Sequence, residues 1–443
     1  MKPVTILSYG MGVESSAILA RWILEPETCP CELLDLIVVT AQTGDEFPDT
    51  GVLVETYLLP LLRQHHIRFV QLARHGHLEA DGITVLDDSR QPTRVHLEGD
   101  YKLSDELRAN GVIPATAGIH RCALRAKAWA IEQWLTKHLC ASEFKHAIGY
   151  NAEETRRIAK SEYAFAAREI REVRMGFGFN VDEKRRIEQA SEYDGLRGRT
   201  SGPRRIEADH ESAPITRTAI YPLMDWGWTR QHCLDYLQQT FGVVWQRSCC
   251  TFCPYGCTKQ NRLLLVERFR RHPEQTADAL MLEYVSLALN PRSMLYCTKS
   301  LYDVVEAAEI SEALTLFRAR LNSSQWAVYR VRRIFNAKQG GDSATASKGT
   351  VQRAVEKLAV LSTRRSAERR VRVLGSSLDA EFETVGDITY AHTVRKGEGY
   401  PTREEFYVAA PAVVDTKARY GIPAFDSKWS PEQAELPLVQ ICA

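Results

Sequence analysis

The first residues of the chain have the types and spacing of a phosphate-binding loop. Residues 7–20 are "LSYGMGVESSAILA", in which two glycines and three serines separate a strand-like run from a helix-like run. Glycines at positions 10 and 12 let the backbone approach a ligand closely and adopt a positive φ. The helix that follows offers free N–H groups and the positive end of its dipole. The loop therefore indicates a pyrophosphate site, although a plain strand-to-helix turn also explains the glycines.

This loop lacks the Gly-Lys-Ser/Thr of a Walker A motif, and a serine at position 15 excludes the dinucleotide pattern G-x-G-x-x-G. The residues expected to hold the ligand are Ser8, Tyr9, Gly10, Gly12, Glu14, Ser15 and Ser16.

Four cysteines fall within the segment "SCCTFCPYGC" at 248–257. A C-x-x-C spacing lets two sulfurs reach one metal ion, and a proline after the cysteine is common beside iron–sulfur ligands. Thiolates suit both Zn²⁺ and a [4Fe–4S] cluster, so the segment predicts a metal centre of either kind. The other cysteines are interpreted as ordinary thiols, with the "C-P-C" at 29–31 the pair to inspect: Cys29, Cys31, Cys140, Cys233, Cys297 and Cys442.

Composition sets the broad class of the protein. The chain has 443 residues, of which 44% are hydrophobic and 26% charged, and its net charge is +1. That length accommodates two or three domains of roughly 150 residues. The sequence shows neither a signal peptide nor a run of 18 apolar residues. No membrane association and a cytoplasmic location are therefore expected, with the cysteines reduced.

Strand-like and helix-like segments alternate through the first part of the chain. The expected strands include 3–8, 33–40, 67–72 and 144–150, and the expected helices include 13–24, 50–65 and 123–138. This alternation predicts an α/β fold with a doubly wound parallel sheet.

The domain organisation follows from changes in composition. Residues 1–260 form the α/β domain, 261–335 a helical extension, and 336–349 ("NAKQGGDSATASKG") a linker. Residues 350–443 are expected to form a small α+β accessory region, which begins with a helix over 350–362.

The loop and four later segments together resemble the PP-loop N-type ATP pyrophosphatases. Within them the chain is most similar to the phosphoadenosine-phosphosulfate (PAPS) reductase family, which includes phage and DNA-sulfur-modification members. The loop resembles the variant that begins Ser-aromatic-Gly, and departs from it at Met11 and Glu14. The other segments follow in the family's order: "VVTAQTGDEFPDT" at 38–50, "HRCALRAK" at 120–127, "IGYNAEETRRI" at 148–158 and "YPLMDWGWTRQHCLDYL" at 221–237.

The resemblance implies an adenine nucleotide alpha-hydrolase-like fold over residues 3–260 and roles for individual residues. Asp45 and Glu46 would lie beside the nucleotide or coordinate Mg²⁺. Asn151 departs from the family's usual arginine, and Ala123 from its threonine. The catalytic residues implied are Cys122, Asp45, Glu154, Arg157 and Lys127, and Thr43 and Arg121 join the nucleotide site.

For the metal centre, the resemblance selects Cys122, Cys250 and Cys253. The fourth ligand is taken as Cys257, with Cys249 as its competitor. A [4Fe–4S] cluster is preferred because family members carry one, and zinc is the alternative.

The chemistry implied is adenylation by ATP. The loop and Mg²⁺ hold the β- and γ-phosphates, a nucleophilic oxygen displaces pyrophosphate, and sulfide, persulfide or ammonia then displaces AMP. Positioning and charge neutralisation carry such a reaction. The implied function is ATP-dependent sulfur transfer, with a cysteine desulfurase or another sulfur donor protein as partner.

A basic stretch points to a nucleic-acid acceptor. Between Arg318 and Arg372 there are fourteen Arg/Lys and three Asp/Glu, a net charge of +11. Such asymmetry is the footprint of polyanion binding, although a solvated linker with an Arg-rich helix also accounts for it. DNA phosphorothioation is favoured over tRNA thiolation, from the family resemblance. The expected contact residues are Arg330, Arg332, Arg333, Arg364 and Arg365.

Two other functions stay open. A reductase of adenylyl sulfate or PAPS would end in "E-C-G-x-H", whereas this chain ends "LVQICA". A catalytically silent nucleotide sensor of a phage or defence system would explain the departures at Met11, Glu14 and Asn151. A homo-oligomer is open too, and Trp226 and Trp228 are expected to be packing residues.

Overall fold

The computed structural model describes residues 4–114, 122–139, 143–155, 157, 204–206, 215–258, 261–338, 347–418 and 421–429. The chain divides into two compact units. The first comprises residues 1–105 and 117–253, and the second comprises 106–116 and 254–443.

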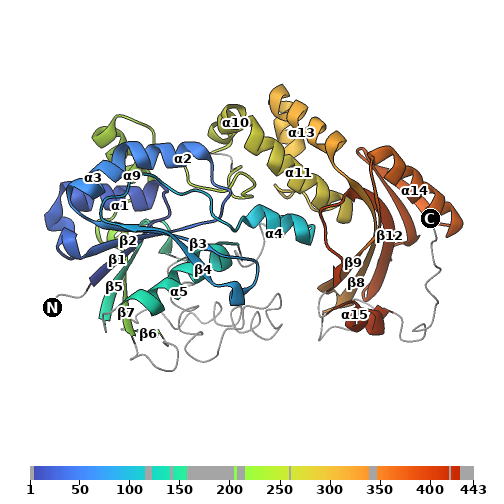
Figure 1. Cartoon of the computed structure of the whole chain (residues 1–443), viewed down its shortest axis with the longest axis horizontal. Coiled ribbons are helices and arrows are strands. Elements are labelled where there is room, and N and C mark those ends of the chain that lie inside the picture. The colour runs from blue at the N-terminus through green and yellow to red at the C-terminus, as the bar shows by residue number, and fades with distance from the viewer. Residues whose placement is uncertain are drawn as a thin grey trace. The chain divides into compact units, whose positions relative to one another are not determined.

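The first unit is built on a seven-stranded sheet with the order β4-β3-β2-β1-β5-β7-β6 (Figure 1). The five central strands are parallel, and β4 and β6 are antiparallel edge strands. The strands are β1 (Val4–Ser8), β2 (Leu36–Gln42), β3 (Arg68–Arg74), β4 (Ile83–Ser89), β5 (Glu143–Ile148), β6 (Arg204–Ile206) and β7 (Ile215–Ile220).

The predicted α/β class is confirmed, and the sheet is mostly parallel, with antiparallel strands at its two edges. Only the short segment 75–82 joins β3 to β4. A parallel connection needs a crossover of a dozen or more residues, so β4 has to return antiparallel.

Helices cover both faces of this sheet (Figure 1). On one face α1, α3 and α9 pack over a core that includes Leu7 and Val38. On the other face α5 packs over Ile6 and Phe144. The helices are α1 (Val13–Leu24), α2 (Pro48–Leu53), α3 (Leu59–Gln64), α4 (Leu103–Asn110), α5 (Trp129–His138), α8 (Pro222–Asp225) and α9 (Arg230–Phe241).

Short helical turns complete the first unit. The π-helical turns are η3 (Val54–Leu58) and η5 (Ala123–Ala128), and the 3₁₀ turns are η1 (Pro26–Thr28), η2 (Leu33–Asp35) and η4 (Glu79–Asp81).

Strand order reverses direction at β1. β1 pairs with β2 on one side and with β5 on its other side, so later strands are added on the opposite side of β1 from β2 and β3. In open α/β sheets, ligands bind outside the carboxyl ends of the strands at such a reversal. The loop of residues 9–12 leaves β1 at this point.

The second unit combines helices with a six-stranded antiparallel sheet of order β10-β11-β12-β8-β9-β13. Its helices are α10 (Arg262–Arg271), α11 (Pro273–Leu289), α12 (Leu301–Ala307), α13 (Ser311–Ser323), α14 (Arg364–Ser377) and α15 (Ile422–Trp429). Its strands are β8 (Trp326–Ala337), β9 (Lys348–Leu361), β10 (Glu381–Val385), β11 (Ile388–Val394), β12 (Thr402–Pro411) and β13 (Lys417–Ala418).

The helix expected over 350–362 is wrong, because this segment is β9. Val351, Val355 and Leu358 have helical spacing, but β9 pairs with β8 along its length. Cross-strand pairing overrides a weak local preference. Residues 336–349, predicted as a linker, connect β8 to β9 of this one sheet, and 339–346 lie outside the described residues.

Within the described part of the chain, no helix has both the length and the apolar character needed to cross a membrane.

Candidate nucleotide and thiol site

The loop after β1 turns through an unusual backbone conformation at Met11. Met11 has φ +59°, whereas Gly12 has φ −83° and Gly10 is not in the positive-φ region. The expectation that the glycines supply positive φ is therefore wrong. A fully buried Met11 holds the strained turn, anchored by Trp245 Nε1, which donates to its carbonyl at 3.3 Å. A Cβ placed on Gly10 would meet nothing within 4 Å, so space is open there.

Most hydroxyl groups of the loop are bonded inside the protein. Ser8 Oγ lies 2.6 Å from His146 Nε2, and Ser15 Oγ donates to the carbonyl of Gly12 at 3.3 Å. Tyr9 is buried and its hydroxyl lies 3.1 Å from Ser16 Oγ, so both side chains belong to the core. The capacity to bind an anion therefore rests mainly on the backbone.

That backbone capacity is available. In the described residues, none of the backbone N–H groups from Gly10 to Ser15 donates to another protein group. No side chain caps α1, whose N-cap residue is Gly12. Free N–H groups at the start of a twelve-residue helix attract an anion electrostatically and by hydrogen bonds.

An acid from α1 meets partners from two other loops. Glu14 forms an ion pair with Arg230, the first residue of α9, and accepts from Asn151 Nδ2 at 3.5 Å. A Cβ on Gly149 would lie 3.2 Å from the backbone nitrogen of Ser15, so the end of β5 passes directly beside the loop. The segments after β1, β5 and β7 therefore converge at one point.

The acidic loop after β2 organises the cysteine segment. Glu46 accepts from Thr50 Oγ1 at 3.0 Å, from Ser248 Oγ at 2.9 Å and from the backbone of Cys249 at 2.6 Å. Asp45 Oδ2 accepts from the backbone nitrogen of Ser104 at 2.8 Å. Both predicted acids are thus hydrogen-bonded to the protein.

Thr43 and Cys250 connect the same two segments. Thr43 Oγ1 lies 3.1 Å from Cys250 Sγ. Burial raises the pKa of Cys250 well above its ordinary value, although Lys127 acts in the opposite sense.

Lys127 is the common electrostatic neighbour of the thiols. Burial lowers the pKa of Lys127, but Glu46, Cys250, Cys253 and Cys249 outweigh that effect, so the pKa is raised. Burial also raises the pKa of the Cys122 thiol, and the charge of Lys127 partly offsets the increase. Lys127 is therefore the cation whose charge Cys122, Cys249, Cys250 and Cys253 have in common as an electrostatic influence.

Thiols are suitable ligands for a thiophilic metal. Among the described residues, however, these side chains do not come together in an arrangement that could coordinate one. No set of three or more His, Cys, Asp or Glu side chains there is arranged to hold a metal ion. Cys257, taken as the fourth ligand, belongs to the second unit, whereas Cys249 belongs to the first. Arg121 lies outside the described residues.

The two other predicted catalytic residues bond to each other. Glu154 forms an ion pair with Arg157 and accepts from the backbone of Asn151 at 3.2 Å. The Arg157 guanidinium lies 4.8 Å from the ring centre of Tyr150.

The tryptophans are packing residues, as predicted. Trp226 and Trp228 pack against the core, and the Arg21 guanidinium lies 4.4 Å and 4.6 Å from their ring centres. Sequence analysis missed His146 and Arg230, which have no local pattern. The only available signal for Arg230 was its position directly after the "DWGWT" segment.

The predicted nucleic-acid contacts are largely paired within the second unit. Arg330 pairs with Glu405, and Arg333 with Glu404. The remaining pairs are Arg332 with Glu356 and Asp426, and Arg364 with Glu368 and Asp387. Arg365 is exposed.

Comparisons of the chain with protein families, with curated proteins and with solved structures found no match. The family resemblance of the motifs therefore enters below only as support for a proposal.

Proposed function

We propose that the first unit binds ATP at the carboxyl edge of its sheet and adenylates an acceptor, releasing pyrophosphate. The observation that carries the proposal is the unpartnered backbone N–H groups from Gly10 to Ser15, beside open space at Gly10. The fold class assigned is the adenine nucleotide alpha-hydrolase-like one. Its support is the strand order, which reverses direction at β1, between β2 and β5.

The convergence of the motif segments is the second support. The first turn of α1 contacts Gly149, Asn151 and Arg230, and a Cβ on Gly12 would lie 3.8 Å from the Cβ of Ser248. Ser248 in turn bonds to Glu46 of the acidic loop. Segments separated by more than 200 residues thus meet beside the proposed phosphate position, which supports the positioning that in-line attack on a bound nucleotide would need.

The thiols around Lys127 are proposed to serve sulfur transfer. Cys122, Cys250 and Cys253, with Cys249 or Cys257, have the donor type for a [4Fe–4S] cluster or zinc, and holding one would require these side chains to come closer together than they do among the described residues. When bound, such a centre would supply a thiophilic site for a sulfur-carrying group. Iron and zinc assays on protein purified without oxygen test this assignment, and a metal-free protein with a C-x-x-C open to alkylation contradicts it.

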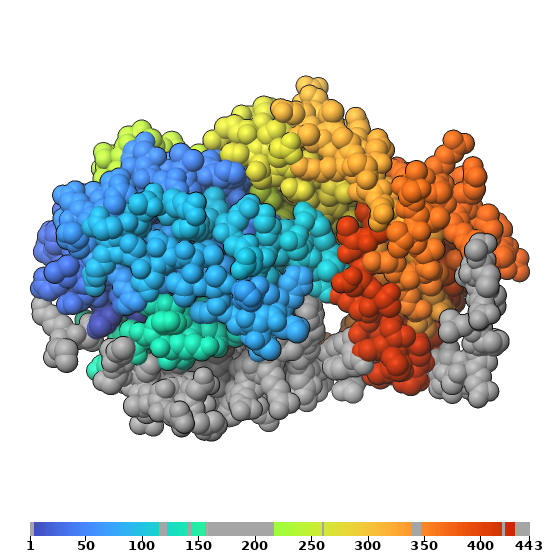
Figure 2. Space-filling model, in the orientation of Figure 1, coloured from blue at the N-terminus to red at the C-terminus, as the bar shows by residue number. Residues whose placement is uncertain are grey.

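Nucleic acid is proposed as the acceptor, and α14 as its contact surface. Arg365, Arg369 and Arg372 occupy one face of α14 and are exposed. Within the described residues, none of these three arginines has an ion-pair or hydrogen-bond partner. Figure 2 shows this part of the chain at the surface of the second unit. Unpaired arginines spaced along a helix face suit a phosphate backbone.

A catalytically silent nucleotide sensor is the second candidate, and one observation favours it. The acids that would hold Mg²⁺ are already engaged, since Asp45 accepts from the backbone of Ser104 and Glu46 accepts three hydrogen bonds. A sensor would bind ATP at the same loop without cleaving the nucleotide.

Product analysis separates the two functions. The protein is incubated with α-labelled ATP and Mg²⁺, with and without duplex DNA or tRNA. AMP and pyrophosphate support adenylation, and the polymer that stimulates their formation identifies the acceptor. ADP and phosphate contradict it, whereas bound ATP without product favours the sensor.

A substitution at Gly10 tests the location of the site. Gly10→Val places a side chain in open space, so the fold is expected to tolerate it while the phosphate position is blocked. Gly399→Val is the matched control, because Gly399 is also exposed with nothing within 4 Å of a Cβ. Loss of ATP binding in the first variant alone is expected. Equal binding by both variants contradicts the assignment.

A further inference from the structure

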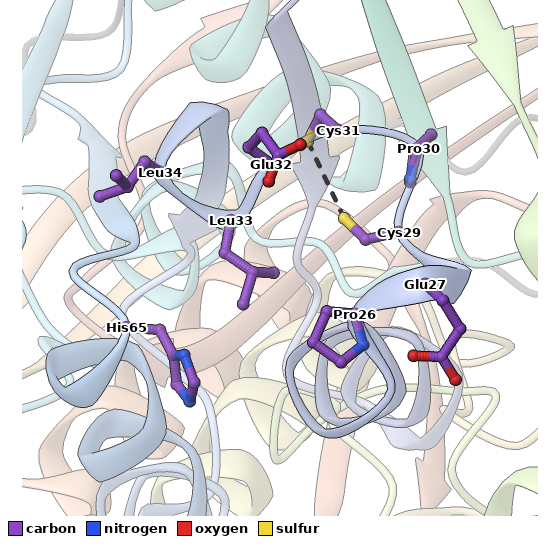
Figure 3. Close-up of a pocket in the computed structure, with 9 residues that line it drawn as sticks. All are labelled: Pro26, Glu27, Cys29, Pro30, Cys31, Glu32, Leu33, Leu34 and His65. Atoms are coloured by element: carbon purple, nitrogen blue, oxygen red, sulfur yellow. Dashed lines mark hydrogen bonds between the residues drawn. The ribbon is translucent and has the colours of Figure 1, made fainter.

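Two cysteines share the wall of a pocket in the loop between α1 and β2. The sulfur atoms of Cys29 and Cys31 face each other at 3.9 Å (Figure 3). The pocket measures about 620 Å³, and Cys29 and Cys31 both line it. The loop precedes β2, so the pair lies at the amino edge of the parallel strands, away from the loop after β1.

The loop holds the two thiols in a fixed relation. The backbone nitrogen of Cys29 donates to the carbonyl of Pro26 at 3.0 Å and ends the η1 turn. Pro30, between the cysteines, has a fixed φ. Cys31 is buried and packs in the core of the first unit, whereas Cys29 is half-buried. The sulfur atoms therefore lie close together in the folded protein.

The hydrogen bond between the two thiols favours the ionised form of Cys31. The hydrogen bond from Cys29 is the largest influence and lowers the pKa of Cys31 to about 7, aided by the Lys145 ammonium and opposed by burial. The same hydrogen bond raises the pKa of Cys29. A thiolate is the nucleophile in thiol–disulfide exchange, and an attacking thiol with a pKa near ambient pH is optimal.

We propose that Cys29 and Cys31 form a redox-active dithiol that reduces small disulfides entering this pocket. The Cys31 thiolate attacks one sulfur of RS–SR, so that a Cys31–SR bond forms and RS⁻ leaves. Cys29 then loses its proton and attacks the Cys31 sulfur, which expels the second RS⁻. The protein gains one disulfide and gives two electrons, and the two leaving thiolates take up the protons as two RSH.

The rim of the pocket indicates which disulfides are favoured. Glu27 and Glu32 line it together with the apolar side chains of Pro26, Leu33 and Leu34. Two carboxylates repel an anionic disulfide and attract a cationic one. The substrate class is therefore a small, neutral or cationic disulfide with an apolar body.

The test maps oxidation in the full chain, in the absence of oxygen and of ATP. Reduced protein is mixed at pH 7 with hydroxyethyl disulfide, quenched with acid, alkylated and digested with trypsin. Residues 22–62 contain no Lys or Arg, so the tryptic peptide 22–63 carries Cys29 and Cys31 and no other cysteine. The peptide 293–299 carries only the exposed Cys297 and serves as the internal control.

The expected result is loss of two hydrogens from peptide 22–63, about tenfold faster than Cys297 acquires a mercaptoethanol adduct. Cys29→Ser should stop at a mixed disulfide on Cys31, which shows that Cys29 resolves it. Oxidation no faster than that of Cys297 overturns the proposal, as does a Cys29→Ser variant that forms no adduct.

A charge series tests the substrate class separately. Cystamine, which is cationic, should react faster than hydroxyethyl disulfide, and dithiodiglycolate, which is anionic, should react slowest. Glu27→Gln should reduce the difference between the cationic and anionic reagents. Equal reaction rates for the cationic, neutral and anionic reagents would overturn the assignment to neutral or cationic disulfides. None of these measurements depends on ATP, so they stand apart from the proposed adenylation.

Discussion

Ser8 and His146 illustrate how single residues are set by burial. His146 is buried in β5, and burial, with the charge of Arg217, lowers its pKa well below the ordinary value. Its Nδ1 has no partner in the described part of the chain. Burying an unpartnered lone pair costs less free energy than burying an unpartnered N–H group. The proton is therefore assigned to Nε2, which donates to Ser8. The Ser8 hydroxyl hydrogen is then free to point at a ligand.

The neutral state of His146 predicts a pH dependence of stability. Below the unfolded-state pKa of about 6.5, the unfolded chain binds a proton at this position and the folded chain does not. The free energy of unfolding should therefore fall with decreasing pH, by up to about 1.4 kcal/mol per pH unit from this group.

Denaturant titrations between pH 8 and 5 measure this slope. His146→Gln keeps a donor for Ser8 and should flatten the slope relative to the unsubstituted chain. Identical slopes in both proteins would show that another group controls acid stability.

The ion pair of Glu14 and Arg230 predicts coupling in nucleotide binding. Arg230→Ala leaves an uncompensated carboxylate beside the proposed phosphate position, so the Kd for ATP should rise about tenfold, or about 1.4 kcal/mol. Adding Glu14→Gln removes that charge and should restore most of the affinity. Calorimetric titration of the two single variants and the double variant measures the coupling. Additive effects would refute the pairing.

Helix α14 carries arginines of two kinds: one that forms ion pairs, and others that form none among the described residues. Its first residue, Arg364, bonds to Glu368 and Asp387 and stacks on Trp326. Arg365, Arg369 and Arg372 have no such partners among the described residues. Equal residue types on one helix thus have different roles, which their order along the sequence does not reveal.

This division predicts different outcomes for two sets of α14 variants. Replacing Arg365, Arg369 and Arg372 together by alanine should weaken duplex binding and reduce the salt slope by about 0.9 for each DNA phosphate that an arginine no longer neutralises. Arg364→Ala is the control on the same helix, and should lower thermal stability while leaving the salt slope unchanged. A larger slope change in the control would place the nucleic-acid surface elsewhere.

At the scale of the whole molecule, the chain forms two units with discontinuous boundaries. Residues 106–116 belong to the second unit, although the residues on either side of them belong to the first. Arg353 of β9 fastens this segment by donating to the carbonyls of Asn110 at 2.7 Å and Gly111 at 3.1 Å. Burial lowers the pKa of Arg353 to about 10.

Arg353→Ala should therefore destabilise the second unit selectively. Two carbonyls lose a charged donor, so the free energy of unfolding should fall by about 2 kcal/mol. Calorimetry should show one transition moved to lower temperature, while the transition that responds to His146→Gln stays in place. A common shift of all transitions would mean that the two units unfold as one.

Features that depend on local pattern could be predicted from the sequence. Periodicity and turn residues located β1, the loop and α1, and the alternation of elements indicated the α/β class. The family resemblance of the C-x-x-C-P segment also selected Cys250 and Cys253, which influence Lys127 electrostatically. These features are encoded within ten to twenty neighbouring residues, because apolar spacing and capping act over that range.

Only the folded chain shows which polar and charged side chains have hydrogen-bond or ion-pair partners. The pair of Glu14 and Arg230 spans 216 residues, and no local pattern encodes such a contact. The same holds for the arginines of β8, for Ser8 with its buried histidine, and for β9, whose pairing with β8 outweighs its helical spacing. The chemistry of the C-P-C thiols also depends on their neighbours, since Lys145 is distant in sequence. Long-range packing sets burial and charge environment, and these decide what a given side chain can do.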